Sequence, residues 1–305
     1  MNLKQKFTIA PIEWDLELEN LAKPFPILEG ILVQSVKDKL TKSSFDLWQP
    51  YVAEDERSKL AEMSYALVHG FMGDSRSGAL ESQEQVRHAF HCLRIVRPTR
   101  ARFIAIQYEQ QEDGRPYVLR FTNPNVYVIN MPDSEVLNRV RLRDLANLRK
   151  LLPAFVKVSA GGTDNLLRAM GYYETGYSEL REPRLQFLIW MMGVEAAYRP
   201  ERSTIQDEEE LTHKIMAEAG ARDIYEDSAE RDLYAVEPLL VGSLLEDMFS
   251  LRDELVHGGG IPAEFLRREV RKTASGHNLN HIDLLRECVS FVLRNRLLSQ
   301  LAAKL

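Results

Sequence analysis

The stretch SLRDELVHGGGIP, residues 250–262, separates Arg252 from His257 by four residues and continues into three glycines. Glycine is common just beyond the end of a helix, so the run predicts a helix that stops at Gly258 and leaves the histidine uncrowded. Residues five positions apart on an ideal helix point about 140° away from each other, so Arg252 and His257 do not share a face. Asp253 and His257 do, and the carboxylate can orient the imidazole. We therefore expect Arg252 to meet His257 only through a bend at the glycines or from a second subunit.

Spacing alone also fits a structural interpretation of the same residues. Asp253 and His257 can be a surface pair, and the glycines can be an ordinary helix stop. The segment RKTASGH, residues 271–277, places an arginine and a histidine at a related interval elsewhere in the chain. Without its surroundings the motif favours the structural interpretation, and the rest of the chain has to separate the two.

Length and composition indicate a globular chain of two domains. The 305 residues are 45% hydrophobic and 28% charged, which is enough apolar material for more than one core. No run approaches the roughly 18 apolar residues of a membrane span, and the N-terminus does not read as a secretory signal, so we expect no membrane partner. The isolated Cys92 and Cys288 favour a reducing, cytoplasmic location. The net charge of −6 means that a polyanion has to be held by a local basic patch.

The N-terminal part mixes strand and helix patterns, which predicts an α+β domain over residues 1–160. We expect it to sense a trigger or to recognise a protein partner. Neither a GxxxxGK[ST] loop nor a GxGxxG loop is present. Helical periodicity predicts helices at 54–68, 83–93 and 142–150. Alternating apolar residues predict strands at 6–14 and 27–36, and a hairpin of 102–110 and 117–130 that turns at QEDGRP.

Residues 161–305 predict an all-helical bundle after the joint SAGGTD, residues 159–164, in which Thr163 or Asp164 caps the first helix. The run LQFLIWMMGVEAAY is apolar nearly all round, which predicts a central buried helix. Glu195 within this run needs a partner, because acids are rarely buried unpaired. Short connections between five helices predict a bundle. The helical segments are 166–180, 183–198, a helix from a capping box at Ser203 and Gln206 to Gly220, 238–257, and 281–305.

The C-terminal region resembles the HEPN superfamily, and within it the Apea-like branch. The resemblance rests on F-x-L-R-D-x-x-V-H-G at 249–258, on VEAAY in the preceding apolar helix and on the terminal amphipathic helix, and it covers about residues 163–305. The family pattern is an arginine, a polar residue and, after four to six intervening positions, a histidine. Arg252, Asp253 and His257 match it, and Glu195 matches the acid that members often carry on the earlier helix. Phe249 stands where tyrosine is more frequent, which concerns packing.

This resemblance implies a metal-independent endoribonuclease that acts as a homodimer, with two motifs in one cleft and no cofactor. RNA supplies its own nucleophile, the 2′-hydroxyl, so a histidine that moves the proton and an arginine that holds the phosphate are sufficient. The catalytic candidates are then Arg252, His257 and Asp253, with Glu195 and Gly258 in support. In prokaryotes such domains commonly act as toxins or antiviral effectors. The alternative is a non-catalytic HEPN module that binds RNA, a nucleotide or a partner protein within a defence complex.

Other clusters carry weaker signals. HAFHC at 88–92 and the set His277, His281 and Asp283 each suggest metal ligands, but neither supplies four convincing ones, so no metal site is predicted. Tyrosines at 172, 173 and 177 suggest base stacking, although their helical spacing favours packing. Two basic runs suggest contact with RNA: RVRLRD at 139–144, and RREVRK, which contributes Arg267, Arg268, Arg271 and Lys272 as candidate RNA-binding residues.

Overall fold

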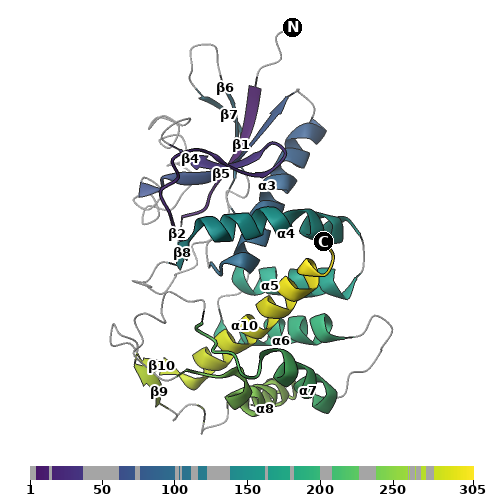
Figure 1. Cartoon of the computed structure of the whole chain (residues 1–305). Helices are drawn as coiled ribbons and strands as arrows, with labels where there is room; N and C mark the ends of the chain where they lie inside the picture. Colours follow the sequence, from purple (N-terminus) through teal and green to yellow (C-terminus); the bar gives the residue numbers. More distant parts are fainter. Residues whose placement is uncertain are drawn as a thin grey trace. The chain divides into compact units, whose positions relative to one another are not determined.

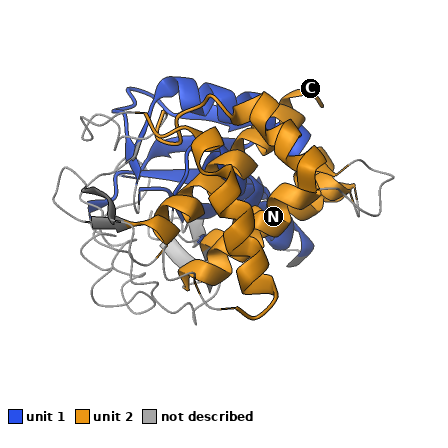
Figure 2. Ribbon diagram, turned by 90° about the horizontal axis from the view of Figure 1, so that it is seen from below, with its two compact units in different colours: residues 1–156 blue, residues 157–305 orange. Residues whose placement is uncertain are grey.

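The computed structural model divides into two compact units, Met1–Val156 and Lys157–Leu305 (Figures 1 and 2). The division falls inside helix α4 (Leu142–Ala160), shortly before the predicted joint. The structure describes residues 5–13, 16–36, 62–72, 76–99, 103, 105–110, 116–121, 138–161, 164–178, 182–199, 208–226, 238–259, 261, 265, 269–272 and 278–305.

Unit 1 is built on a six-stranded sheet in the order β3-β4-β5-β1-β6-β7, and every neighbouring pair is antiparallel. The predicted hairpin is confirmed over β6 and β7, and residues 122–130 of its predicted second strand lie outside the described residues. A separate parallel pair, β2 with β8, precedes helix α4. The strands are β1 (Gln5–Pro11), β2 (Leu16–Leu18), β3 (Phe25–Leu28), β4 (Ile31–Ser35), β5 (Tyr65–Met72), β6 (Ile106–Gln110), β7 (Pro116–Phe121) and β8 (Asn138–Val140).

Two predictions for this sheet are wrong in detail. The helix predicted at 54–68 ends in residues that belong to β5, which pairs with β4 on one side and β1 on the other; residues 51–61 lie outside the described residues. The strand predicted at 27–36 is a hairpin of β3 and β4, because Gly30 adopts a φ of 78° and turns the chain. A Cβ at Gly30 would also lie 2.9 Å from the ring of His69.

Helix α3 (Arg76–Val96) contains the predicted helix 83–93 and packs against β1 and β5. A buried polar network joins it to the sheet. Ser82 Oγ lies 2.6 Å from Thr8 Oγ1 and 2.8 Å from His69 Nδ1. Gln107 Nε2 donates to Thr8 Oγ1 at 3.1 Å. Because buried polar groups are costly unless they are bonded, this network favours one position of the helix on the sheet.

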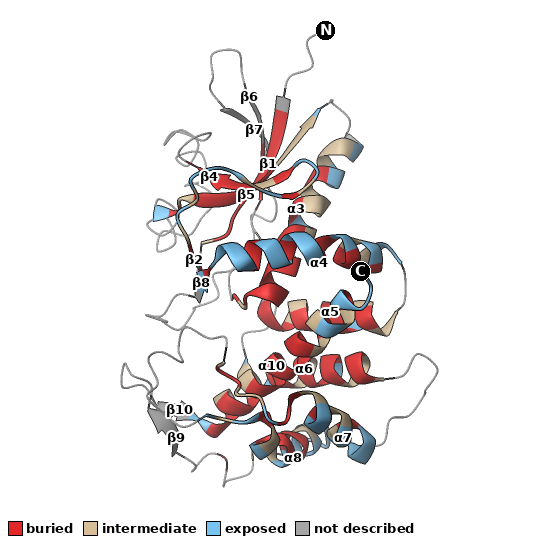
Figure 3. Ribbon diagram, viewed as in Figure 1, coloured by how far each residue is buried: buried red, intermediate tan, exposed pale blue. Residues whose placement is uncertain are grey.

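Helix α4 begins at the predicted residue and is amphipathic. Its start is fixed by Asp144, whose Oδ2 accepts from Arg141 N at 2.9 Å and from Nε of Arg97, the residue after α3, at 2.9 Å. The side chains of Arg97 and Asp144 are both buried. The ring of Phe155 lies 5.8 Å from that of His88 on α3. The alternating red and pale blue bands of α4 in Figure 3 show the buried and exposed faces that result.

Unit 2 contains the five predicted helices, so a mostly helical C-terminal part is confirmed. The helix predicted from residue 238 is shorter than expected, because Val241–Ser243 forms a 3-10 turn, η3, before α8 begins. A two-stranded sheet of β9 (Glu269–Lys272) and β10 (Asn278–Asn280) means that the unit is not all-α. The predicted capping box at 203–206 lies outside the described residues. The helices are α5 (Asn165–Ser178), α6 (Pro183–Tyr198), α7 (Glu208–Ala219), α8 (Leu245–Val256) and α10 (His281–Ala302).

Helix α6 is central, as predicted, and packs against α5 and α10. Trp190 is only 3% exposed, and its Nε1 donates to the Tyr173 carbonyl at 3.1 Å. The Trp190 ring also lies 4.8 Å from that of Tyr177. The helix is not buried all round, since Leu185 and Met192 are exposed. Both Tyr173 and Tyr177 are core residues, so packing and not base stacking explains them.

Candidate functional site

The end of helix α8 has the geometry that its glycines predict. His257 is the C-cap, and its backbone N–H donates to the Asp253 carbonyl at 3.0 Å. Gly258 has a φ of 76°, and Gly259 N donates to the Glu254 carbonyl at 2.7 Å, which is the long hydrogen bond of a Schellman stop. A Cβ at Gly259 would lie 2.2 Å from Glu254 Oε2. The helix stop therefore fixes the backbone of His257 while its side chain is exposed.

Arg252 lies at the centre of a cluster of three carboxylates, one from each of three helices. Its Nη1 donates to Glu195 Oε1 of α6 at 3.0 Å, and its Nη2 donates to Glu208 Oε2 of α7 at 2.6 Å. Its Nε donates to Asp253 Oδ1 of α8 at 2.8 Å. The guanidinium also lies over the ring of Phe249, 5.3 Å from its centroid. These contacts tie the start of α7 and the last turn of α6 to α8.

The charge of Arg252 is fixed by this environment. Burial acts to lower the pKa of Arg252, but the hydrogen bonds and charges of Asp253 and Glu195 outweigh it and raise the pKa above its usual value. The side chain is 21% exposed. A guanidinium has five N–H donors, and here most of them face carboxylates. A phosphate that binds Arg252 in this arrangement has to displace at least one carboxylate.

The structure brings together some of the predicted site residues and not others. Glu195 has the partner that its place in an apolar helix requires, and this partner is Arg252. Asp253 bonds Arg252 and has no bond to the His257 side chain, so the predicted Asp253–His257 hydrogen bond is wrong. The His257 side chain has no hydrogen bond or ion pair among the described residues. Sequence analysis missed Glu208; the only sign of it is a helix start with three consecutive acids.

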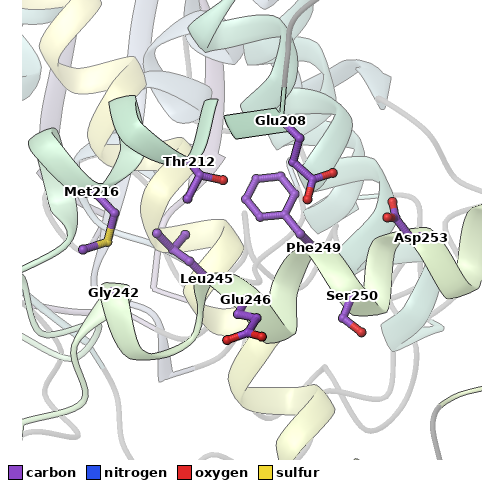
Figure 4. A pocket seen from close by; sticks show the side chains of 9 residues that line it. All are labelled: Glu208, Thr212, Met216, Gly242, Leu245, Glu246, Phe249, Ser250 and Asp253. Carbon is purple, nitrogen blue, oxygen red and sulfur yellow. The ribbon is translucent and has the colours of Figure 1, made fainter. Parts of the chain in front are cut away.

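A groove of about 490 Å³ runs beside this cluster, between α7, η3 and α8 (Figure 4). Its apolar lining includes Met216, Leu245 and Phe249, and its acids are Glu208, Glu246 and Asp253; none of the described lining residues is basic. In Figure 4 the labelled residues extend from Met216 and Gly242 at one end to Asp253 at the other. Two of the acids are those that hold Arg252. The groove is therefore negatively charged and does not by itself suit a phosphate.

The weaker candidates have ordinary surroundings or lie outside the described residues. Arg267, Arg268 and His277 lie outside them, and Arg271 and Lys272 belong to β9. Cys92 is buried on α3, which raises the pKa of its thiol. His281 Nε2 lies 2.8 Å from Asp247 Oδ2, and Asp283 Oδ1 pairs with Arg286 at 3.3 Å. Across the described ranges, no group of three or more His, Cys, Asp or Glu side chains is arranged to hold a metal ion.

No protein-family model, no curated protein and no solved structure matches this chain. The resemblance to the HEPN superfamily therefore stays a prediction from the sequence. Among the helices that the structure describes, none is both long enough and apolar enough to cross a membrane.

Proposed function

We propose that the C-terminal unit is a metal-independent endoribonuclease of the HEPN type that acts as a homodimer in the cytoplasm, as a toxin or as an effector of prokaryotic antiviral defence. The observation that carries the proposal is the ion pair of Arg252 and Glu195, at 3.0 Å across 57 residues of sequence. The resemblance assigned these two residues to one site from their helices alone. Their contact is what a site shared by α6 and α8 requires.

The proposed chemistry needs one proton carrier and one phosphate holder. The 2′-hydroxyl of the RNA attacks the adjacent phosphorus as His257 takes its proton, and the bond to the 5′-oxygen breaks. The leaving oxygen receives a proton from the histidine of the second copy, which leaves a 2′,3′-cyclic phosphate and a 5′-hydroxyl. Arg252 holds the phosphate oxygens and the charge that develops on them. His257 suits proton transfer because its imidazole is exposed at a fixed helix end.

Cleavage is expected to survive chelation. The purified chain is incubated with total RNA in excess EDTA, and the new ends are mapped by their reaction with a kinase and a phosphatase. We expect unchanged rates and cyclic-phosphate ends, because the 2′-hydroxyl replaces a metal-bound water as nucleophile. Activity that EDTA abolishes and that zinc or magnesium restores would contradict the proposal and point to a metal-activated water.

Asp253→Asn tests whether this acid acts on Arg252 or on His257. Asparagine keeps an acceptor for Arg252 Nε and removes one charge from an exposed ion pair that contributes about 0–1 kcal/mol. We therefore expect kcat/KM to change by less than about fivefold, and the pH of half-maximal rate to stay the same. Glu254→Gln, at the next position, which is also exposed, is the control. A loss as large as that of His257→Ala, or a shifted pH profile, would show that Asp253 acts on the proton transfer.

A second candidate function is that of a non-catalytic HEPN module. The bonding of most guanidinium donors of Arg252 to carboxylates favours it. Three carboxylates already occupy most of the guanidinium donors, which is how a structural arginine is held. Such a module binds RNA, a nucleotide or a partner protein without cutting. The EDTA experiment separates the two functions, because a binding module gives no cyclic-phosphate ends under any condition.

A further inference from the structure

The charge of unit 2 is unfavourable for a polyanion. Residues 157–305 contain 25 acidic and 18 basic residues, a formal net charge of −7, whereas residues 1–156 carry a net charge of +1. The groove beside the candidate site is also lined by three acids, which repel a polyanion further. RNA binding is driven largely by the neutralisation of phosphates by lysine and arginine. A ribonuclease with this charge distribution needs a cationic surface elsewhere.

The exposed face of α4 and of the strand before it is such a surface. Between residues 139 and 150 this surface carries five cations, and the described part of the chain contains no ion pair for any of them; they are Arg139, Arg141, Arg143, Arg149 and Lys150. The helix contributes one acid in this region, Asp144, and that side chain is buried and paired with Arg97. Glu17 lies opposite Arg139 in the β2–β8 pair, and Glu19 Oε2 accepts from Leu142 N at 3.2 Å, so the strand end and the helix start are partly balanced. Arg149 and Lys150, further along the helix, have no such acid among the described residues.

The geometry of α4 suits a backbone contact. Arg143 and Lys150 are seven residues apart, so they lie on one side of the helix and about 10.5 Å apart along its axis. Arg149 is adjacent to Lys150. The opposite side is anchored in the core by leucines and by the buried pair of Arg97 with Asp144, so the cations stand on a rigid support. Because no described acid pairs with these cations, they can neutralise phosphates without first breaking an ion pair within the described part of the chain.

We propose that this basic face of α4 binds the phosphate backbone of RNA. The proposal rests on the proposed function, since it adds a contact for the RNA substrate outside the acidic surroundings of Arg252. The described residues of the face include no aromatic side chain, so it reads the backbone and not the bases. A membrane surface fits less well, because an interfacial helix turns its apolar side outward and α4 buries that side, leaving Leu142 as its exposed large apolar residue.

The test measures the affinity of the full chain for a fluorescent, 2′-O-methylated RNA of about 20 nucleotides, in EDTA, at several salt concentrations. The methylated sugar cannot act as a nucleophile, so binding is measured without cleavage. The variant Arg143→Gln/Arg149→Gln/Lys150→Gln is compared with Arg87→Gln/Arg184→Gln/Lys214→Gln. The control removes the same charge from three cations that the structure pairs with acids.

We expect the slope of log affinity against log salt to become shallower by about 2 in the α4 variant, since each phosphate contact on a single strand contributes about 0.7. The same relation predicts a loss of about a hundredfold at 0.1 M salt. The control variant should keep the slope of the unmodified chain. Equal slopes in the two variants would overturn the proposal, and so would RNA binding that is absent in the unmodified chain while anionic phospholipid vesicles bind in an α4-dependent way.

These outcomes are independent of cleavage. If the chain binds RNA through α4 and yields no cyclic-phosphate ends, the proposed nuclease function is wrong and the proposal that α4 binds RNA is supported. If it cleaves RNA and the α4 variant binds as tightly as the control, the proposed nuclease function is supported and the proposal that α4 binds RNA is wrong.

Discussion

Replacing His257 with alanine is expected to reduce RNA cleavage by about 10²- to 10⁴-fold, the contribution of a positioned general acid or base. The fold should be unaffected, because the side chain is exposed and has no partner among the described residues. The helix stop depends on the backbone of residues 257–259, which alanine retains. Melting temperature and single-turnover cleavage of a defined RNA measure the two effects separately.

His213→Ala is the matched control for this change. His213 is also an exposed histidine of unit 2, on α7, so its replacement removes the same chemical group from the same kind of surface. It should leave both cleavage and stability as they are. Cleavage that is equal in the two alanine variants would remove His257 from the site and with it the proposed mechanism.

Gly176→Ala is expected to destabilise unit 2 by about 3 kcal/mol, because it adds a methyl group where α5 meets α6. The new Cβ would lie 2.2 Å from Trp190 Nε1 and 2.5 Å from its Cε2. The indole has to move, and its hydrogen bond to the Tyr173 carbonyl, 3.1 Å long, is lost with it. Thermal unfolding should show a decrease of roughly 6–12 °C in the melting temperature of the unit.

Gly171→Ala, on the same helix, is the control for this substitution. It is exposed, and a Cβ at this position has nothing within 4 Å. Alanine has the higher helix propensity by about 1 kcal/mol, so this variant should be slightly more stable than the unmodified chain. The two changes are chemically identical. If both variants unfold at the same temperature, the close packing of Gly176 on Trp190 does not exist in solution.

The sequence predicted the helices of unit 2 better than the sheet of unit 1, for a physical reason. The helices α5, α6 and α10 are longer than a typical strand, and each has a distinct start, such as Asp164 before α5, whose Oδ1 accepts from Leu166 N at 2.9 Å. Strand β5 has no such pattern, since Tyr65 to Val68 are buried in succession at the centre of the sheet. A short apolar run buried on both faces does not distinguish a strand from a helix.

Within the candidate site, the sequence predicted a contact only where a charged residue stands in an apolar segment. Glu195 in an apolar helix demanded a cation, and Arg252 is that cation. The contact of Glu208 with Arg252 could not be predicted in this way, because an acid at the start of a helix is favourable without a cationic partner. The sequence also did not decide the hydrogen-bond partner of the Asp253 side chain, which can accept from the neighbouring arginine or from the histidine four residues later. The permanently charged guanidinium, with several donors, is the stronger partner.

Glu208 and Asp253 each belong to two structures, the carboxylate cluster of Arg252 and the wall of the acidic groove. The two are therefore thermodynamically linked, and the linkage is reciprocal. A cation that enters the groove draws these carboxylates away from Arg252 and makes the guanidinium more available to a phosphate. A phosphate on Arg252 releases the same carboxylates and strengthens the groove for a cation. Each exposed ion pair contributes about 0–1 kcal/mol, so the coupling through one carboxylate amounts to about fivefold in affinity at most.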